Sequence, residues 1–170
     1  HLIAEALTLY RPRVPVVYNS SGFCKTEALE QIAPYVDIWL PDFKFYSPAL
    51  AERYTGRKDY FDYASQAISF MAQKPVVFRE DGKMLSGIIV RHLVLPMNAG
   101  DSKNVLSFLR AVLGADTPLS LMRQYVPMGE AERFPELTRK TNAREYARDV
   151  DHALSLGFTN VYTQKKESAD

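Results

Sequence analysis

The sequence predicts an α/β fold in which a parallel sheet is flanked by helices. Short apolar segments that favour strands alternate along the chain with segments of helical period. The strand-like segments are apolar on both faces, which is typical of parallel strands that are covered on both sides. An open sheet and an incomplete (β/α) barrel both satisfy this pattern. In either case ligands bind at the carboxyl ends of the strands.

Local signals place the elements in the first part of the chain. Ser47 followed by Pro48 is typical of a helix start, and Gly56 of a helix end. Thr26 is the expected N-cap of an earlier helix. We therefore expect helices over 2–9, 26–33 and 47–56, and strands over 14–18 and 36–40.

The second part of the chain continues the alternation. Asp81-Gly82 predicts a hairpin or loop, and Asn142 with Glu145 three residues later has the spacing of a capping box. We expect helices over 60–73, 102–113 and 142–156, strands over 88–95 and 119–124, and a last short strand in "NVYT". The last helix is expected to bury a stripe made of Ala143, Tyr146, Ala147, Val150, Ala153 and Leu154.

Composition narrows the classes of partner. The net charge is +1 and no run of Lys and Arg is long, so we expect no nucleic-acid partner. The apolar runs are far shorter than a membrane span, so we expect no membrane partner. Cys24 is the only cysteine, which excludes an intrachain disulfide and favours a cytoplasmic location.

The chain starts at His1, inside what reads as an amphipathic helix, and we interpret it as a fragment of a longer protein. Residues 1–164 are expected to form the carboxyl-terminal portion of one domain. Residues 165–170 are expected to be a polar tail.

Polar residues stand where the predicted strands end, and these are the candidate site residues. Asp42 and Lys44 have the same parity, so both side chains point to one face if the strand continues through them. Arg91 interrupts an apolar run and needs a buried acidic partner, such as Asp42, or an anionic ligand. The candidates from all strand ends are Asn19, Ser20, Asp42, Lys44, Arg91, Gln124 and Tyr125.

Other residues have simpler interpretations. His92 has the parity opposite to that of Arg91 and is expected to be a hydrogen-bonded core histidine. Cys24 is expected to be a structural thiol. The segment 125–140 is long for a loop, which favours a lid over the substrate or a docking surface above a plain surface excursion.

Four segments, "VVYNSSGF", "VDIWLPDFKFYSPALAERYTG", "VRHLVLP" and "QYVPMGEAERFPELTRK", resemble the radical S-adenosylmethionine (SAM) enzymes related to pyruvate formate-lyase activating enzyme. The resemblance implies a partial (β/α) barrel whose first strands are missing from this chain. It also implies SAM and a 4Fe-4S cluster as cofactors, with the three cluster-binding cysteines upstream of this fragment. The activity implied is reductive cleavage of SAM to a 5'-deoxyadenosyl radical.

The resemblance assigns roles to five of the candidates. Asn19, Ser20, Asp42, Lys44 and Arg91 match positions that approach SAM in the family, while Gln124 and Tyr125 fall on the substrate side. Asn19 stands where the family has an acidic residue, and Val126 about where glycyl-radical activases have a histidine. A glycyl-radical enzyme is the implied protein partner, and the fragment alone is expected to be inactive. Two other hypotheses stay open, namely a barrel lyase that works through Lys44 and a non-catalytic α/β binding module.

Overall fold

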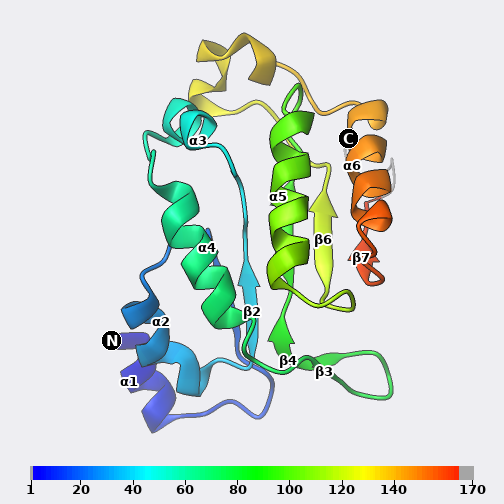
Figure 1. The fold of residues 1–170 in the computed structure, drawn as a ribbon. Coiled ribbons are helices and arrows are strands. Elements are labelled where there is room, and N and C mark those ends of the chain that lie inside the picture. The colour runs from blue at the N-terminus through cyan, green and yellow to red at the C-terminus, as the bar shows by residue number, and fades with distance from the viewer. Residues whose placement is uncertain (1, 165–170) are drawn as a thin grey trace.

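The computed structural model describes residues 2–164 as one α/β array of parallel strands with helices packed against it (Figure 1). The predicted polar tail, 165–170, lies outside the described residues. The first half contains α1 (Leu2–Leu9), β1 (Val17–Ser20), α2 (Thr26–Ile32), η1 (Ala33–Tyr35), β2 (Ile38–Pro41), α3 (Pro48–Thr55), α4 (Tyr60–Met71) and β3 (Val77–Phe78). The second half contains β4 (Met84–Ile88), β5 (Val90–Leu93), α5 (Ala99–Val112), β6 (Leu119–Met122), η2 (Gly129–Arg133), η3 (Pro135–Leu137), α6 (Ala143–Ser155) and β7 (Val161–Tyr162).

The parallel strands lie side by side in chain order. β1 pairs with β2, β2 with β4, β5 with β6, and β6 with β7, all in parallel. The pairing along β2 continues from β4 to β5 without a gap. Ile89 N donates to Trp39 O at 2.9 Å, and Phe43 N donates to Arg91 O at 2.8 Å. The prediction of parallel strands with their carboxyl ends on one edge is therefore confirmed. Across the described residues the strands form no closed barrel.

The predicted strand over 88–95 is displaced and interrupted. Strand pairing starts earlier, at Met84, and a break at Ile89 separates β4 from β5. β3 pairs antiparallel with β4, as expected for a hairpin around Asp81-Gly82. Gly87 lies in this hairpin with φ 123°, and a Cβ there would meet Val76 Cα at 2.8 Å. Only glycine fits this close approach, so the backbone conformation determines the residue type at this position.

The helices cover one face of the sheet, and α4 and α5 lie across it in Figure 1. Along β5 and β6 burial alternates strictly, with one residue buried and the next half-buried. The expectation that both faces are buried therefore holds at the start of β2, where Ile38 and Trp39 are both buried, and is wrong for β5 and β6. We call the face with the half-buried residues the open face. The buried face joins the helices in one core that includes Trp39, Phe43, Val90, Leu119, Leu121, Ile68, Met71, Leu106 and Leu109.

Side-chain caps mark the starts of α3 and α6. The Ser47 side chain accepts a hydrogen bond from Leu50 N with Pro48 at the first helical position, and Gly56 ends α3 in the left-handed conformation. The capping box of Asn142 and Glu145 is present at the start of α6. Thr26 is not an N-cap, because α2 begins there and Lys25 occupies the cap position without a side-chain bond.

The predicted stripe of α6 is partly wrong. Tyr146 and Ala153 are buried and Val150 is half-buried, but Ala143, Ala147 and Leu154 are exposed. Glu145 and Asp149 take their place among the buried residues of this helix. Apolar periodicity overlooked them because both are acidic. In the part of the chain that the structure describes, no helix combines the length and apolar character needed to cross a membrane.

Candidate functional site

The open face carries a cluster of charges at the carboxyl ends of β1, β2 and β5. Arg91 Nη2 lies 2.7 Å from Asp42 Oδ1, and Lys44 Nζ lies 3.1 Å from Asp42 Oδ2. Arg91 Nη2 also donates to Asn19 Oδ1 at 2.6 Å. We call Asn19, Asp42, Lys44 and Arg91 the charge cluster. The alternation of strand side chains brings them to one face, as the parity of Asp42 and Lys44 predicts.

The charge cluster is held tightly but is incompletely bonded. The side chains of Asp42 and Arg91 are only 18% and 23% exposed. Although Arg91 Nη2 and Asp42 Oδ1 are close, the contact lacks hydrogen-bond geometry, and Asp42 Oδ1 has no hydrogen-bond partner among the described residues. Arg91 Nε has none there either. Buried polar atoms of this kind are normally bonded, so the cluster has one acceptor and one donor available for a ligand.

The backbone on both sides of Asp42 is fixed by neighbouring groups. Gly22, with φ 77°, packs so closely that a Cβ there would lie 2.0 Å from Asp42 O. The Tyr60 hydroxyl accepts from Lys44 N at 2.9 Å and donates to Ser21 O at 3.1 Å. Burial raises the pKa of Tyr60, so this hydroxyl keeps its proton. Sequence reasoning missed Tyr60, because a tyrosine on an apolar helix face looks like an ordinary core residue.

The other predicted site residues are placed differently. Ser20 alternates to the face opposite Asn19, and its hydroxyl accepts from Gly22 N at 3.3 Å, so it shapes the turn after β1. Gln124 is exposed, and its Oε1 accepts from Gln164 Nε2 at 3.1 Å. Tyr125 lies inward, and its hydroxyl donates to Leu137 O at 2.9 Å. Tyr125 thus lines the cavity described in the next paragraph, whereas Ser20 and Gln124 do not.

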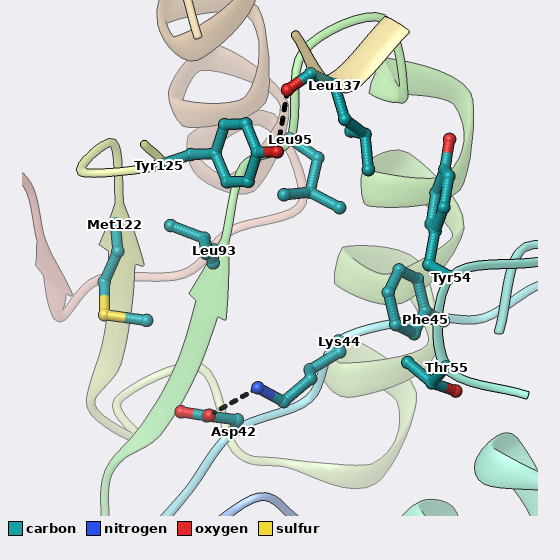
Figure 2. Close-up of a pocket in the computed structure, with 10 residues that line it drawn as sticks. All are labelled: Asp42, Lys44, Phe45, Tyr54, Thr55, Leu93, Leu95, Met122, Tyr125 and Leu137. Atoms are coloured by element: carbon teal, nitrogen blue, oxygen red, sulfur yellow. Dashed lines mark hydrogen bonds and ion pairs between the residues drawn. The ribbon is translucent and has the colours of Figure 1, made fainter. Parts of the chain in front are cut away.

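A cavity of about 270 Å³ lies directly beyond Lys44 (Figure 2). Asp42 and Lys44 stand at one end of it, and the opposite end is bordered by Tyr125 and Leu137. We call it the site pocket. Its lining consists of Asp42, Lys44, Phe45, Tyr54, Thr55, Leu93, Leu95, Met122, Tyr125 and Leu137. The apolar members come from strands and loops far apart in the sequence, and so no local pattern indicated them.

The segment 125–137, drawn in gold above α3 in Figure 1, borders the site pocket and is anchored to α3. Arg53 donates to both carboxylate oxygens of Glu136, at 2.9 and 3.3 Å, and Tyr54 OH donates to Glu136 Oε1 at 2.8 Å. The hydrogen bonds from Arg53 lower the pKa of Glu136 to about 2, so the anchor stays charged at neutral pH. Phe134 packs edge-on against Tyr54 with ring centroids 5.1 Å apart.

The face covered by helices holds a second polar group behind the charge cluster. His92, 2% exposed, contacts Phe43 O through Nδ1 at 2.7 Å and Ser102 Oγ through Nε2 at 3.0 Å. The prediction of a hydrogen-bonded core histidine is confirmed. Because Phe43 O can only accept, Nδ1 carries the hydrogen. Burial lowers the pKa of His92 and keeps the ring neutral, so Nε2 accepts the Ser102 hydroxyl hydrogen.

Asp149 is fully buried beside Ser102, and neither carboxylate oxygen has a hydrogen-bond partner among the described residues. Burial raises the pKa of Asp149 to about 6, while the neighbouring Ser102 hydroxyl and the charges of Arg148 and Lys103 act in the opposite direction. We call His92, Ser102 and Asp149 the buried relay. It ends at Phe43 O, between Asp42 and Lys44.

Comparison with known proteins supports the fold and leaves the activity open. No family model matches the chain. An uncharacterized protein of Methanocaldococcus jannaschii is 24% identical over 161 residues, which are 94% of this chain and 44% of that protein. The chain thus spans less than half the length of this curated relative. A crystal structure of a domain of pyruvate-formate lyase-activating enzyme from Bacteroides vulgatus superimposes with a TM-score of 0.65 at 11% identity, over 96% of this chain and 92% of that domain.

The likeness to that domain extends over nearly the whole described fold. At 11% identity it shows a shared α/β architecture and carries no residue roles. The predicted fold class, a parallel sheet flanked by helices and related to that of the activating enzyme, therefore holds in this coarser form.

Proposed function

We propose that this chain supplies the SAM-binding face of a radical SAM enzyme related to pyruvate formate-lyase activating enzyme. The observation that carries the proposal is the Asp42–Arg91 pair, which lies at the carboxyl edge of a parallel sheet with one unpartnered buried oxygen and one unpartnered buried nitrogen. Ligands of open α/β sheets bind at this edge. The shared fold with a domain of an activating enzyme supports the same assignment.

The charge cluster fits the chemistry of SAM. Its methionine end presents an ammonium and a carboxylate, and its ribose presents two hydroxyl groups. Asp42 Oδ1 is suited to accept from the ammonium or a hydroxyl, and Arg91 Nε to donate to the carboxylate. Asn19 orients Arg91, and Lys44 balances the second oxygen of Asp42. Ser20 has a supporting place in this proposal, as the residue that shapes the adjacent turn.

The residues of this chain do not fit the iron–sulfur cluster. A 4Fe-4S cluster with one open iron needs three thiolates, and the sequence has only Cys24. Among residues 2–164 no group of three His, Cys, Asp or Glu side chains could hold a metal ion. A cluster held by cysteines outside this chain would supply the electron that cleaves SAM to methionine and a 5'-deoxyadenosyl radical. What these residues would do is bind and orient SAM and shield it on one side.

The last part of the proposal is the substrate that gives up a hydrogen atom to the radical. The resemblance to activating enzymes implies a glycyl-radical protein as partner, and a small-molecule substrate held in the site pocket beside Lys44 is the alternative. A Schiff-base lyase is less well supported, because Lys44 is paired with Asp42 instead of standing among apolar groups alone.

Binding of SAM tests the proposal on this chain. Calorimetric titration is expected to show weak binding by the wild type and loss of about tenfold in affinity for Asp42→Asn and Arg91→Gln. Asp62→Asn, an exposed carboxylate on α4, is the matched control and should bind as the wild type does. Equal affinity in all four proteins, or no binding by the wild type, would reject the charge cluster as a SAM site.

Activity is tested on a longer protein that contains this chain. After anaerobic reconstitution with iron and sulfide, reduction should yield 5'-deoxyadenosine, and Asp42→Asn should lower the yield. Absence of this product, with the cluster present by its absorbance, would leave a binding module as the better description.

A further inference from the structure

We infer that the site pocket binds a small-molecule substrate with an aliphatic or aromatic body and one carboxylate. This inference rests on the proposed function, since it names the substrate class of the same site. Three features carry it: the chemistry of the walls, the charge at one end, and the size of the cavity. Each argues against a polar segment of a partner protein as the occupant.

The walls of the pocket are apolar. Leu93, Leu95 and Met122 line it from the open face of the sheet, and Phe45 and Leu137 from the loops above. A polypeptide backbone placed there would lose hydrogen bonds to water without gaining partners, which costs free energy for each buried amide. An alkyl or aryl group gains by leaving water in the same place. The walls therefore select a substrate with an apolar body.

The charge at the inner end selects the polar group. Arg91 and Lys44 both pair with Asp42, so two cations face one carboxylate and the group carries a net charge of +1. The Lys44 ammonium has three N–H donors, and its contact with Asp42 Oδ2 uses one of them. Its side chain is 40% exposed and lines the pocket. A carboxylate fits this end, while an ammonium would meet two positive charges.

The size and closure of the pocket favour a small molecule. Its volume of about 270 Å³ is about that of nine waters in the liquid, which suits a ligand of roughly ten non-hydrogen atoms. The hydrogen bond from Tyr125 OH to Leu137 O joins the two ends of the segment 125–137 beside the pocket. In Figure 2 this bond lies at the end of the cavity opposite Lys44, so a ligand in the pocket is covered at that end.

Four probes test the inference on this chain without any cofactor. Octanoate has both features, octan-1-ol lacks the charge, octylamine reverses it, and acetate lacks the apolar body. Methyl NMR spectra and calorimetry near pH 7 are expected to show octanoate binding about tenfold more tightly than octanol, with shifts at the methyl groups of Leu93 and Met122. Acetate and octylamine should produce no such shifts.

Two substitutions sharpen the test. Lys44→Met should reduce the affinity for octanoate to that for octanol, while Lys58→Met, at an exposed lysine between α3 and α4, should leave it unchanged. Met122→Phe should weaken octanoate and octanol alike by about tenfold, because it fills the pocket without touching Lys44. Circular dichroism confirms that each variant is folded.

The outcomes separate this inference from the proposed function. Equal binding of octanol and octanoate, or octanoate binding that Lys44→Met leaves intact, would overturn the carboxylate. Absence of methyl shifts with every probe would overturn the pocket as a substrate site. If SAM binds through Arg91 and octanoate does not bind, the proposed function survives and the inference fails. If octanoate binds and SAM does not, the inference stands for a different enzyme.

Discussion

Each face of the sheet holds a polar group that contains an aspartate, but the two aspartates have opposite surroundings. On the open face, Asp42 lies between two cations. On the face covered by helices, Asp149 is fully buried and has no cation within ion-pair distance among the described residues. The backbone of the sheet separates the two groups. Under the proposed function the charges on the open side meet a ligand, while on the covered side His92 bonds the Phe43 carbonyl.

In this fold, the surroundings of a polar side chain depend on strand parity more than on residue type. Asp42 and Phe43 are neighbours in sequence, yet the Asp42 side chain points to the site, while the carbonyl of Phe43 accepts a hydrogen bond from His92 of the buried relay. The same applies to Arg91 and His92. Substitutions on the covered side should therefore change stability most, and those on the open side should change binding most.

The largest effect on stability is expected for His92→Phe. The substitution leaves Phe43 O buried without a donor, at a cost of about 2 kcal/mol, and forces a larger ring into a fully buried site, at a cost of about 2 kcal/mol more, giving about 4 kcal/mol in the free energy of unfolding. Urea denaturation measures this. His152→Ala, at a surface position of α6, is the control and should change stability by less than about 0.5 kcal/mol. If His92→Phe lowers the free energy of unfolding as little as the control does, the buried relay does not stabilise the fold.

The next effect is a dependence on pH set by Asp149. Its pKa is raised to about 6 in the folded state from an ordinary value of 3.8, so between these values only the folded protein keeps the proton. Stability should therefore fall as pH rises through this window, by about 3 kcal/mol in total. Asp149→Asn should remove the fall, and Asp151→Asn, exposed on the same helix, should retain it. Unfolding curves from pH 4 to pH 8 that are parallel for all three proteins would contradict the assignment.

A smaller effect on stability is expected for Asp42→Asn. Lys44 is 40% exposed and stays solvated when the carboxylate is removed, and Arg91 keeps its hydrogen bond to Asn19, so the loss should be about 1 kcal/mol. The affinity for SAM should fall much more than this loss suggests. A thermal unfolding scan and a SAM titration on the same sample measure both. A stability loss as large as that of His92→Phe would erase the distinction between the two faces.

The smallest effect concerns the anchor of the segment 125–137. Glu136→Gln removes the charge that Arg53 holds and should increase amide hydrogen exchange in residues 126–134 about threefold, with the global melting temperature unchanged. Glu130→Gln, which alters the exposed pair with Arg133 inside the segment, is the control. Mass spectrometry of deuterated peptides resolves the segment. Equal exchange in both variants would show that the anchor does not order it.

Much of the fold could be predicted because its signals are local. The cap at Ser47 and the box at Asn142 depend on residues within one helical turn, and both are present as predicted. Strand limits were less accurate, since pairing begins at Met84 and breaks at Ile89 for reasons that lie in the neighbouring strands. The open face was not foreseen, because apolar strand residues look the same whether or not a second layer covers them.

The site was predictable only where strand geometry governs it. The shared parity of Asp42 and Lys44, and the unusual charge at Arg91, were sufficient to predict a common cluster. The site pocket was not predictable, because its walls come from α3, β5, β6, η3 and the loops that follow β2, β5 and β6, whose meeting depends on tertiary packing. Tyr60 and Glu136 act through hydrogen bonds to residues far away in the sequence, for which one sequence carries no signal.

The chain-order arrangement of the strands has a consequence for how the protein is made. Each parallel strand pairs with the strand next to it in chain order, and only a crossover segment separates the two. A nascent chain leaving the ribosome can therefore add each new strand to a partner that has already been synthesised. No strand among residues 2–164 has to wait for a distant one, which keeps the loops closed during folding short. Assembly from the amino-terminal side would complete the β2–β5 junction, and with it the charge cluster, before α6 is made.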